Sequence, residues 1–187
     1  TVVLALDGGA TALLSAAPHG PPEVVTALLV ARATVDLANN DGTTPLLIAA
    51  EIGHHEVVAA LIAARATVDK ANNDGWTPLL MAAQGGHHEI VAALIAARAT
   101  VDLADKYGLT PLSAAAREGH HEVVTALIAA DATVDQAGSN GATPLFMAAQ
   151  NGHPEVVKAL IDAGATVDLA NNDGTTPLLI AAEIGHH

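Results

Sequence analysis

Histidine, aspartate and serine are the side chains of this sequence that could do chemistry, and the histidines recur at a fixed spacing. The first histidine of each Gly-His pair returns every 33 residues, at His54, His87, His120, His153 and His186. If equivalent positions lie on neighbouring packed helices, these side chains are roughly 10 Å apart. A zinc ion needs ligands at about 2 Å, so the row predicts structural histidines and no metal site.

The remaining polar residues form no catalytic arrangement. Five aspartates also repeat every 33 residues: Asp36, Asp69, Asp102, Asp135 and Asp168. They are too far apart to act as a catalytic acid–base pair, and we interpret them as loop acids that close local turns. The three serines lie in no nucleophile motif, and neither a phosphate-binding glycine loop nor a His-Glu-x-x-His sequence is present. We therefore predict a protein that is not an enzyme and has no cofactor.

Charge and composition exclude further classes of function. Among 187 residues, 20 Asp and Glu face seven Lys and Arg, for a net charge of −13. Such a surface repels phosphate backbones and anionic lipids, so nucleic acid and membrane partners are not expected. The longest apolar runs, such as residues 57–64, are far shorter than the about 20 residues of a membrane span. Zero cysteines fit an intracellular, cytoplasmic protein without excluding a secreted one.

The elements that position these residues follow from the 33-residue period. Loop glycines recur at Gly9, Gly42, Gly75, Gly108, Gly141 and Gly174. Thr-Pro-Leu follows five of them, and Gly-His and Glu-Val-Val or Glu-Ile-Val recur in the same register. Each unit predicts a loop, a short helix, a turn and a second helix. In the second unit, Thr44 caps a first helix over 46–51, Gly53 breaks it, and Glu56 opens the second helix.

The pattern Asp-Gly-x-Thr-Pro-Leu, then Ala-Ala-x-x-Gly-His-x-Glu-Val-Val, resembles the ankyrin repeat over the whole chain. The resemblance implies an all-α repeat solenoid of helix-turn-helix repeats with hairpin-like loops, about five and a half repeats forming one domain over residues 1–187. It also implies a concave face of loops and first helices that binds proteins without catalysis. One leucine per repeat should be buried in equivalent places: Leu46, Leu79, Leu112, Leu145 and Leu178.

Two departures from the family pattern bear on stability. The family usually has histidine after Thr-Pro-Leu, whereas this chain has Leu47, Leu80, Ser113, Phe146 and Leu179, so apolar packing mostly replaces a polar tie between repeats. The family favours glycine after the second helix, where Arg32, Arg65, Arg98 and Asp131 stand here and only Gly164 conforms. These four residues are either strained in the left-handed region or wound differently.

The two ends of the sequence are related. Residues 33–55 and 165–187 are identical over 23 positions, four periods apart; duplication and design both explain this identity, and the irregular framework between them favours duplication. The last repeat stops before its second helix. Ile180 and its neighbours should therefore be under-buried, and end-to-end self-contact through this truncated repeat is a further prediction.

Residues that differ between repeats are free to serve a partner. Two of the three aromatic residues fall at predicted loop tips, where cationic and apolar neighbours give a composition typical of binding hot spots. The predicted partner-binding residues are Trp76, Lys106, Tyr107, Leu109, Arg117 and Met81. Met81 and Phe146 also suit the core between repeats, and Trp76 could instead pack on its own neighbours.

The sequence thus predicts a non-catalytic module that binds a partner protein, of basic or amphipathic character, on its loop and inner-helix face. Two alternatives stay open: a structural spacer or assembly segment, and a regulatory array cut from a larger enzyme or channel. In the first reading, replacing Trp76 by alanine weakens binding and leaves folding nearly intact.

Overall fold

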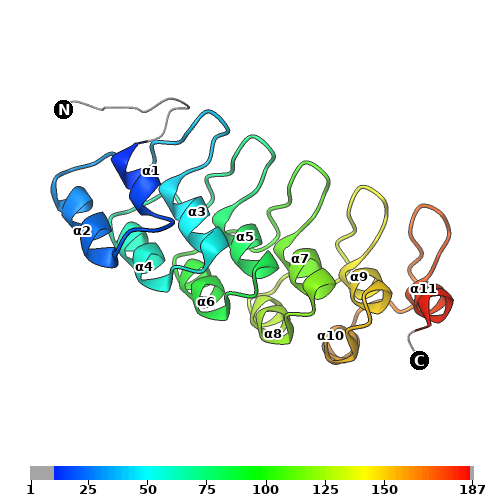
Figure 1. Ribbon diagram of the computed structural model, residues 1–187. Coiled ribbons are helices and arrows are strands. Elements are labelled where there is room, and N and C mark those ends of the chain that lie inside the picture. The colour runs from blue at the N-terminus through cyan, green and yellow to red at the C-terminus, as the bar shows by residue number, and fades with distance from the viewer. Residues whose placement is uncertain (1–10, 186–187) are drawn as a thin grey trace. The chain divides into compact units, whose positions relative to one another are not determined.

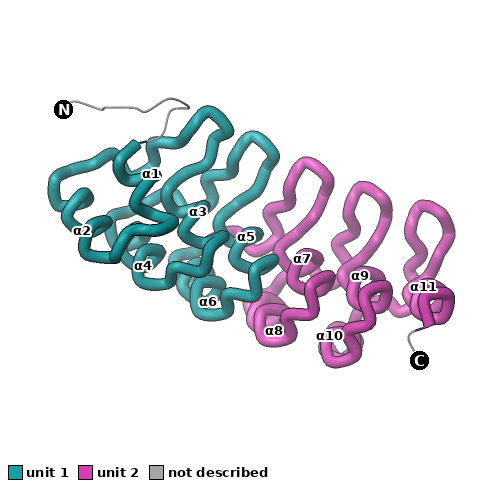
Figure 2. The backbone as a smooth tube through the Cα atoms, in the orientation of Figure 1, with its two compact units in different colours: residues 1–99 teal, residues 100–187 magenta. Residues whose placement is uncertain are grey.

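The computed structural model describes residues 11–185, which form eleven helices. The chain divides into two compact units, residues 1–99 and 100–187 (Figure 2). Gly9, His186 and His187, on which sequence predictions also depend, lie outside the described residues. That residues 1–187 form a single domain remains a prediction.

Unit 1 is a stack of helix pairs (Figure 1). The first helices of its repeats are α1 (Ala12–Ala16), α3 (Pro45–Ile52) and α5 (Pro78–Gln84), and the second helices are α2 (Pro22–Val30), α4 (His55–Ala63) and α6 (His88–Ala96). Helix α3 packs against α4, its partner in the repeat, and against α1 and α5 of the neighbouring repeats.

Unit 2 repeats this arrangement. Its first helices are α7 (Pro111–Glu118), α9 (Pro144–Gln150) and α11 (Pro177–Ile184), and its second helices are α8 (His121–Ala129) and α10 (Pro154–Asp162). The loops before α7, α9 and α11 project from the same side of the unit (Figure 1). Residues 11–185 contain no β-strand, and none of their helices is long and apolar enough to cross a membrane. The predicted all-helical repeat fold is confirmed.

The first helices begin where the Thr-Pro pairs predict. The Thr44 side chain accepts a hydrogen bond from the Leu47 backbone N–H at 3.2 Å, and Pro45 occupies the first helical position. This satisfies one of the free N–H groups of the first turn. The same cap recurs at Thr11, Thr77, Thr110, Thr143 and Thr176.

The second helices end in a left-handed residue. Arg32, Arg65, Arg98 and Asp131 have φ between 62° and 67°, and Gly164 has φ 91°. After this residue, the Ala66 N–H reaches back to the Leu61 carbonyl at 3.0 Å and closes the end of α4. The four non-glycine residues therefore adopt the strained conformation; they are not wound differently.

The leucines of the Thr-Pro-Leu motif form the core in four repeats and not in the last. Leu46, Leu79, Leu112 and Leu145 are at most 2% exposed, whereas Leu178 is 75% exposed. The prediction that Leu178 is buried was wrong. Among the described residues α11 packs chiefly against α9, and no second helix covers its other face. The related prediction for the neighbours of Ile180 is confirmed, since Leu179 and Ile184 are also about half exposed.

The repeating aspartates do more than close a local turn. The Asp36 carboxylate accepts hydrogen bonds from the backbone N–H and the hydroxyl of Thr67, with the hydroxyl at 2.6 Å. Asp102 and Asp135 make the same bonds to the threonines that stand 31 residues later, Thr133 and Thr166. Each of these aspartates ties the start of a repeat to the residues that follow its second helix, so the prediction of a purely local turn was wrong.

Candidate functional site

The predicted binding residues fall in both units, Trp76 and Met81 in unit 1 and the other four in unit 2. Each group is built by a loop and the first helix that follows it.

Trp76 lies at the end of a tight loop in unit 1. The Asn72 side chain accepts hydrogen bonds from the backbone N–H groups of Asp74 and Trp76, both at 3.0 Å, and the Asn72 N–H donates to the Trp76 carbonyl. Gly75, with φ 85°, supplies the left-handed residue that this loop needs. The loop therefore has the hairpin-like course that was predicted, although no strands form.

The Trp76 side chain packs inward. It is half-buried against a cluster of buried residues formed by Leu47, Leu80 and Met81. Met81 is only 7% exposed. Leu47 and Leu80 stand where the family usually has histidine, so apolar packing has replaced the polar tie here as expected. Trp76 therefore contributes to packing and also stays partly exposed. Met81 is one of the buried residues that its ring packs against.

The backbone of the loop of unit 2 that carries Tyr107 is fixed by hydrogen bonds from within the loop and from the next loop. The Asp105 carboxylate accepts from the N–H groups of Tyr107 and Leu109, each at 2.8 Å. The Tyr107 carbonyl accepts from the Ser139 N–H at 2.8 Å and from the Ser139 hydroxyl at 2.6 Å. Residue 107 is thus held from its own loop and from the next loop of the same unit.

The Tyr107 side chain, in contrast, is 63% exposed. The Lys106 ammonium lies 5.2 Å from the centroid of the ring, within the range of a cation–π interaction. Leu109 is half-buried at the base of the loop. An aromatic ring is therefore presented to solvent on a fixed backbone, with a positive charge beside it.

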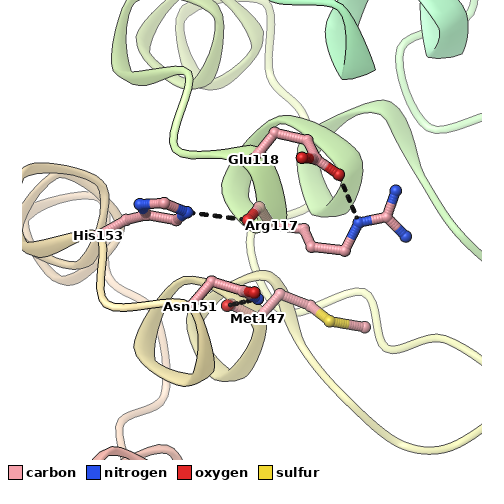
Figure 3. Close-up of polar contacts among 5 residues, drawn as sticks. All are labelled: Arg117, Glu118, Met147, Asn151 and His153. Atoms are coloured by element: carbon pink, nitrogen blue, oxygen red, sulfur yellow. Dashed lines mark hydrogen bonds and ion pairs between the residues drawn. The ribbon is translucent and has the colours of Figure 1, made fainter. Parts of the chain in front are cut away.

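Arg117 stands near the end of α7, on the helix that the Tyr107 loop enters. Its Nε donates to the Glu118 carboxylate at 2.9 Å, and both side chains are partly exposed (Figure 3). Its carbonyl pairs with Nε2 of His153 at 2.9 Å, which joins the end of α7 to the start of α10. This contact gives His153 the structural role predicted for the histidines, and His87 makes the same contact with the Glu51 carbonyl.

One residue of this region was not predicted. The half-buried Met147 side chain of α9 extends in the same direction as that of Arg117 (Figure 3). Met147 could have been found from the sequence because it stands at a position of the first helix that varies between repeats. In successive repeats that position is Ile48, Met81, Ala114, Met147 and Ile180. We call Lys106, Tyr107, Leu109, Arg117 and Met147 the Tyr107 surface.

The polar residues that the structure describes form no metal-binding group, and two of the three serines make hydrogen bonds within the fold. In residues 11–185 no three His, Asp or Glu side chains gather closely enough to hold a metal ion. Ser113 is buried and pairs with the Thr110 hydroxyl, and Ser139 donates to the Tyr107 carbonyl.

Comparison with known proteins agrees with the repeat pattern. A family model described as ankyrin repeats (3 copies) matches residues 4–72, 64–137 and 129–187. No curated protein matches the chain.

Proposed function

Because the chain belongs to the family of ankyrin repeats, which generally mediate binding between proteins and are typically non-catalytic, we propose that it holds a partner protein on the Tyr107 surface. The observation that carries the proposal is an exposed tyrosine on a backbone fixed by four hydrogen bonds. Tyrosine and arginine are enriched among the residues that dominate binding energy. A fixed loop loses little conformational entropy when the partner binds, which favours affinity.

The charge of the chain indicates the chemistry of the partner. With a net charge of −13, the protein attracts a basic or amphipathic surface and repels an acidic one. Leu109, in the same loop as Tyr107, supplies apolar contact area. We therefore propose a basic or amphipathic partner whose apolar groups meet the tyrosine ring and whose basic residues face the acidic parts of the chain, away from Lys106.

Trp76, in unit 1, is a separate candidate contact for a partner. Its half-buried ring leaves one side available to a partner, while Met81 holds that ring from below. Because the ring also packs on the core, a loss of binding in a Trp76 variant would not separate contact from folding. Tyr107 is the better probe.

The experiment places a photoreactive phenylalanine analogue at position 107 and, as a control, at position 173, which is the same place in another loop of unit 2. We expect a partner to be cross-linked from position 107 and not from position 173. Its affinity is then measured for Tyr107→Asn, a residue that position 140 already carries in this loop position. The expected loss is at least about thirtyfold, or 2 kcal/mol. Equal labelling from both positions, or unchanged affinity, would contradict the proposal.

The alternative functions make different demands on the same experiment. A structural spacer or assembly segment needs no partner at Tyr107 and should tolerate Tyr107→Asn. A regulatory array of a larger protein would cross-link to a segment of that same protein.

A further inference from the structure

The second helices of unit 1 each have an acidic residue at the beginning and a basic residue after the end. Helices α2, α4 and α6 lie side by side in this unit (Figure 1). The two charged residues of each helix are nine positions apart: Glu23 and Arg32, Glu56 and Arg65, and Glu89 and Arg98. We call the three glutamates the Glu row and the three arginines the Arg row.

Both rows are exposed and without partners in the part of the chain that the structure describes. All six residues are exposed, and none of their side chains makes a hydrogen bond or ion pair with residues 11–185. No charged residue stands between the two rows on any of the three helices. The residues exposed there are small or apolar, such as Ala59, Ala63 and Ala92. The two rows therefore border a helix face that carries no charge of its own.

The Arg row occupies strained backbone positions. Arg32, Arg65 and Arg98 have φ between 62° and 67°, whereas Gly164 stands at the same place in unit 2. Glycine adopts this conformation without the steric penalty that arginine meets. A strained residue is a reason to look for a function. Besides the strained backbone, the three arginines share an exposed positive charge without a partner, so we look for the function in that charge.

The two rows of one copy complement those of a second copy when the helices of the two copies run antiparallel. Arginines of neighbouring repeats are roughly 10 Å apart, and so are the glutamates, because both rows follow the same packed helices. A two-fold axis through the middle of α4 reverses the direction of the helices and the order of the repeats. It therefore brings each arginine opposite a glutamate of the other copy: Arg65 opposite Glu56, Arg32 opposite Glu89, and Arg98 opposite Glu23.

We propose that unit 1 binds unit 1 of a second copy of this chain through the face of α2, α4 and α6 between the Glu row and the Arg row. A helix of nine residues is about 13 Å long, and three such helices side by side span about 30 Å. Two copies would thus bury about 800 Å² in total, the size of a weak, reversible contact. We expect a Kd of about 0.1–1 mM.

The distribution of charge allows this contact although the whole chain is acidic. Residues 1–99 contain nine of the 20 acids and four of the seven cations, so unit 1 carries −5 and unit 2 carries −8. At an ionic strength of about 0.15 M, exposed charges more than about 8 Å apart are largely screened. Unit 2 has no such pair of rows, since Glu122 and Asp131 leave both ends of α8 acidic. The proposed contact is therefore specific to unit 1.

The test uses the absence of cysteine from the chain. Ala60 stands in the middle of α4, so the proposed axis brings the Ala60 residues of two copies together. Ala126 has the same place in α8 and is also half-buried, which makes it a matched control. In the whole protein at about 0.1 mM, we expect Ala60→Cys to form a disulfide-linked dimer under mild oxidation at least about tenfold faster than Ala126→Cys.

Charge variants of the Ala60→Cys protein test the two rows. Arg65→Glu should slow cross-linking to the rate of Ala126→Cys, because glutamates then face each other. Adding Glu56→Arg to that variant should restore the rate, since the pair is reversed in both copies. Arg65→Gly should also slow cross-linking while relieving strain in the fold, which separates lost association from lost folding. Tyr107→Asn should leave the rate unchanged, so this contact is tested independently of the Tyr107 surface.

Three results would overturn the proposal. The first is an equal rate of cross-linking from positions 60 and 126. The second is an unchanged rate for Arg65→Glu. The third is a rate that Glu56→Arg fails to restore when circular dichroism shows that the double variant is folded.

Discussion

Replacing Arg65 by glycine should stabilise the protein, although a side chain is removed from the folded state. Arg65 has φ 64° at the end of α4, and its exposed side chain makes no hydrogen bond or ion pair with residues 11–185. The substitution therefore removes backbone strain and no polar side-chain contact. The reverse change, Gly164→Arg, imposes the strain at φ 91°, where an added Cβ would meet no atom within 4 Å.

The expected size follows from two opposing terms. A non-glycine residue in the left-handed region costs roughly 1–2 kcal/mol. Glycine loses more backbone freedom on folding, which returns about 0.5–1 kcal/mol of that gain. The net stabilisation expected for Arg65→Gly is about 0.5–1 kcal/mol, with the opposite sign for Gly164→Arg.

Urea denaturation followed by circular dichroism measures this difference. With a slope of about 1–3 kcal/mol per M, Arg65→Gly should raise the midpoint by roughly 0.2–1 M at unchanged slope. Arg65→Ala serves as the control, because it removes the same charge and keeps the strain, so it should not raise the midpoint. A lower midpoint for Arg65→Gly, or equal gains for glycine and alanine, would refute the reasoning.

Three further substitutions test the repeat contacts. Gly53→Ala should lower the melting temperature more than Gly185→Ala: both glycines have positive φ, but only at Gly53 would the new Cβ lie 2.6 Å from a histidine ring of the next repeat. Asp102→Ala should cost about 1 kcal/mol in urea unfolding, because it removes three hydrogen bonds, whereas Asp168→Ala should stay within about 0.5 kcal/mol. Trp76→Ala should cost about 1–2 kcal/mol, less than the 3–5 kcal/mol of a fully buried ring; a thermal melt that does not move would show that its packing contributes nothing.

The positions of the helices were predicted well from local signals, because each signal consists of residues that are adjacent in the sequence. Thr44 and Pro45 specify a helix start whatever surrounds them, and the structure places one there. The left-handed residue after the second helix was one of two conformations that the sequence left open, since arginine stands where the family favours glycine. Repetition of these signals at one period predicted the fold class.

Burial was predicted less well, because it depends on which element covers a residue. Leu46 and Leu178 have identical sequence surroundings and opposite exposure. Trp76 was expected at a loop tip, with packing on its neighbours as the alternative, but the residues that it packs against, Leu47, Leu80 and Met81, are brought together only by the fold. The 31-residue reach of Asp36 was missed for the same reason, since its partner is close only after the repeat has folded.

Within each unit, the hydrogen bonds between residues far apart in the sequence affect the order of folding during synthesis. They join residues 31 to 36 positions apart, as from Asp36 to Thr67 or from Glu51 to His87. A contact of this span can close once about one more repeat has left the ribosome, which takes roughly 2–7 s at about 5–20 residues per second. A chain still being translated can therefore bury the apolar faces of its helices one repeat at a time. The stretch whose apolar residues are exposed to solvent at any moment is then about one repeat long.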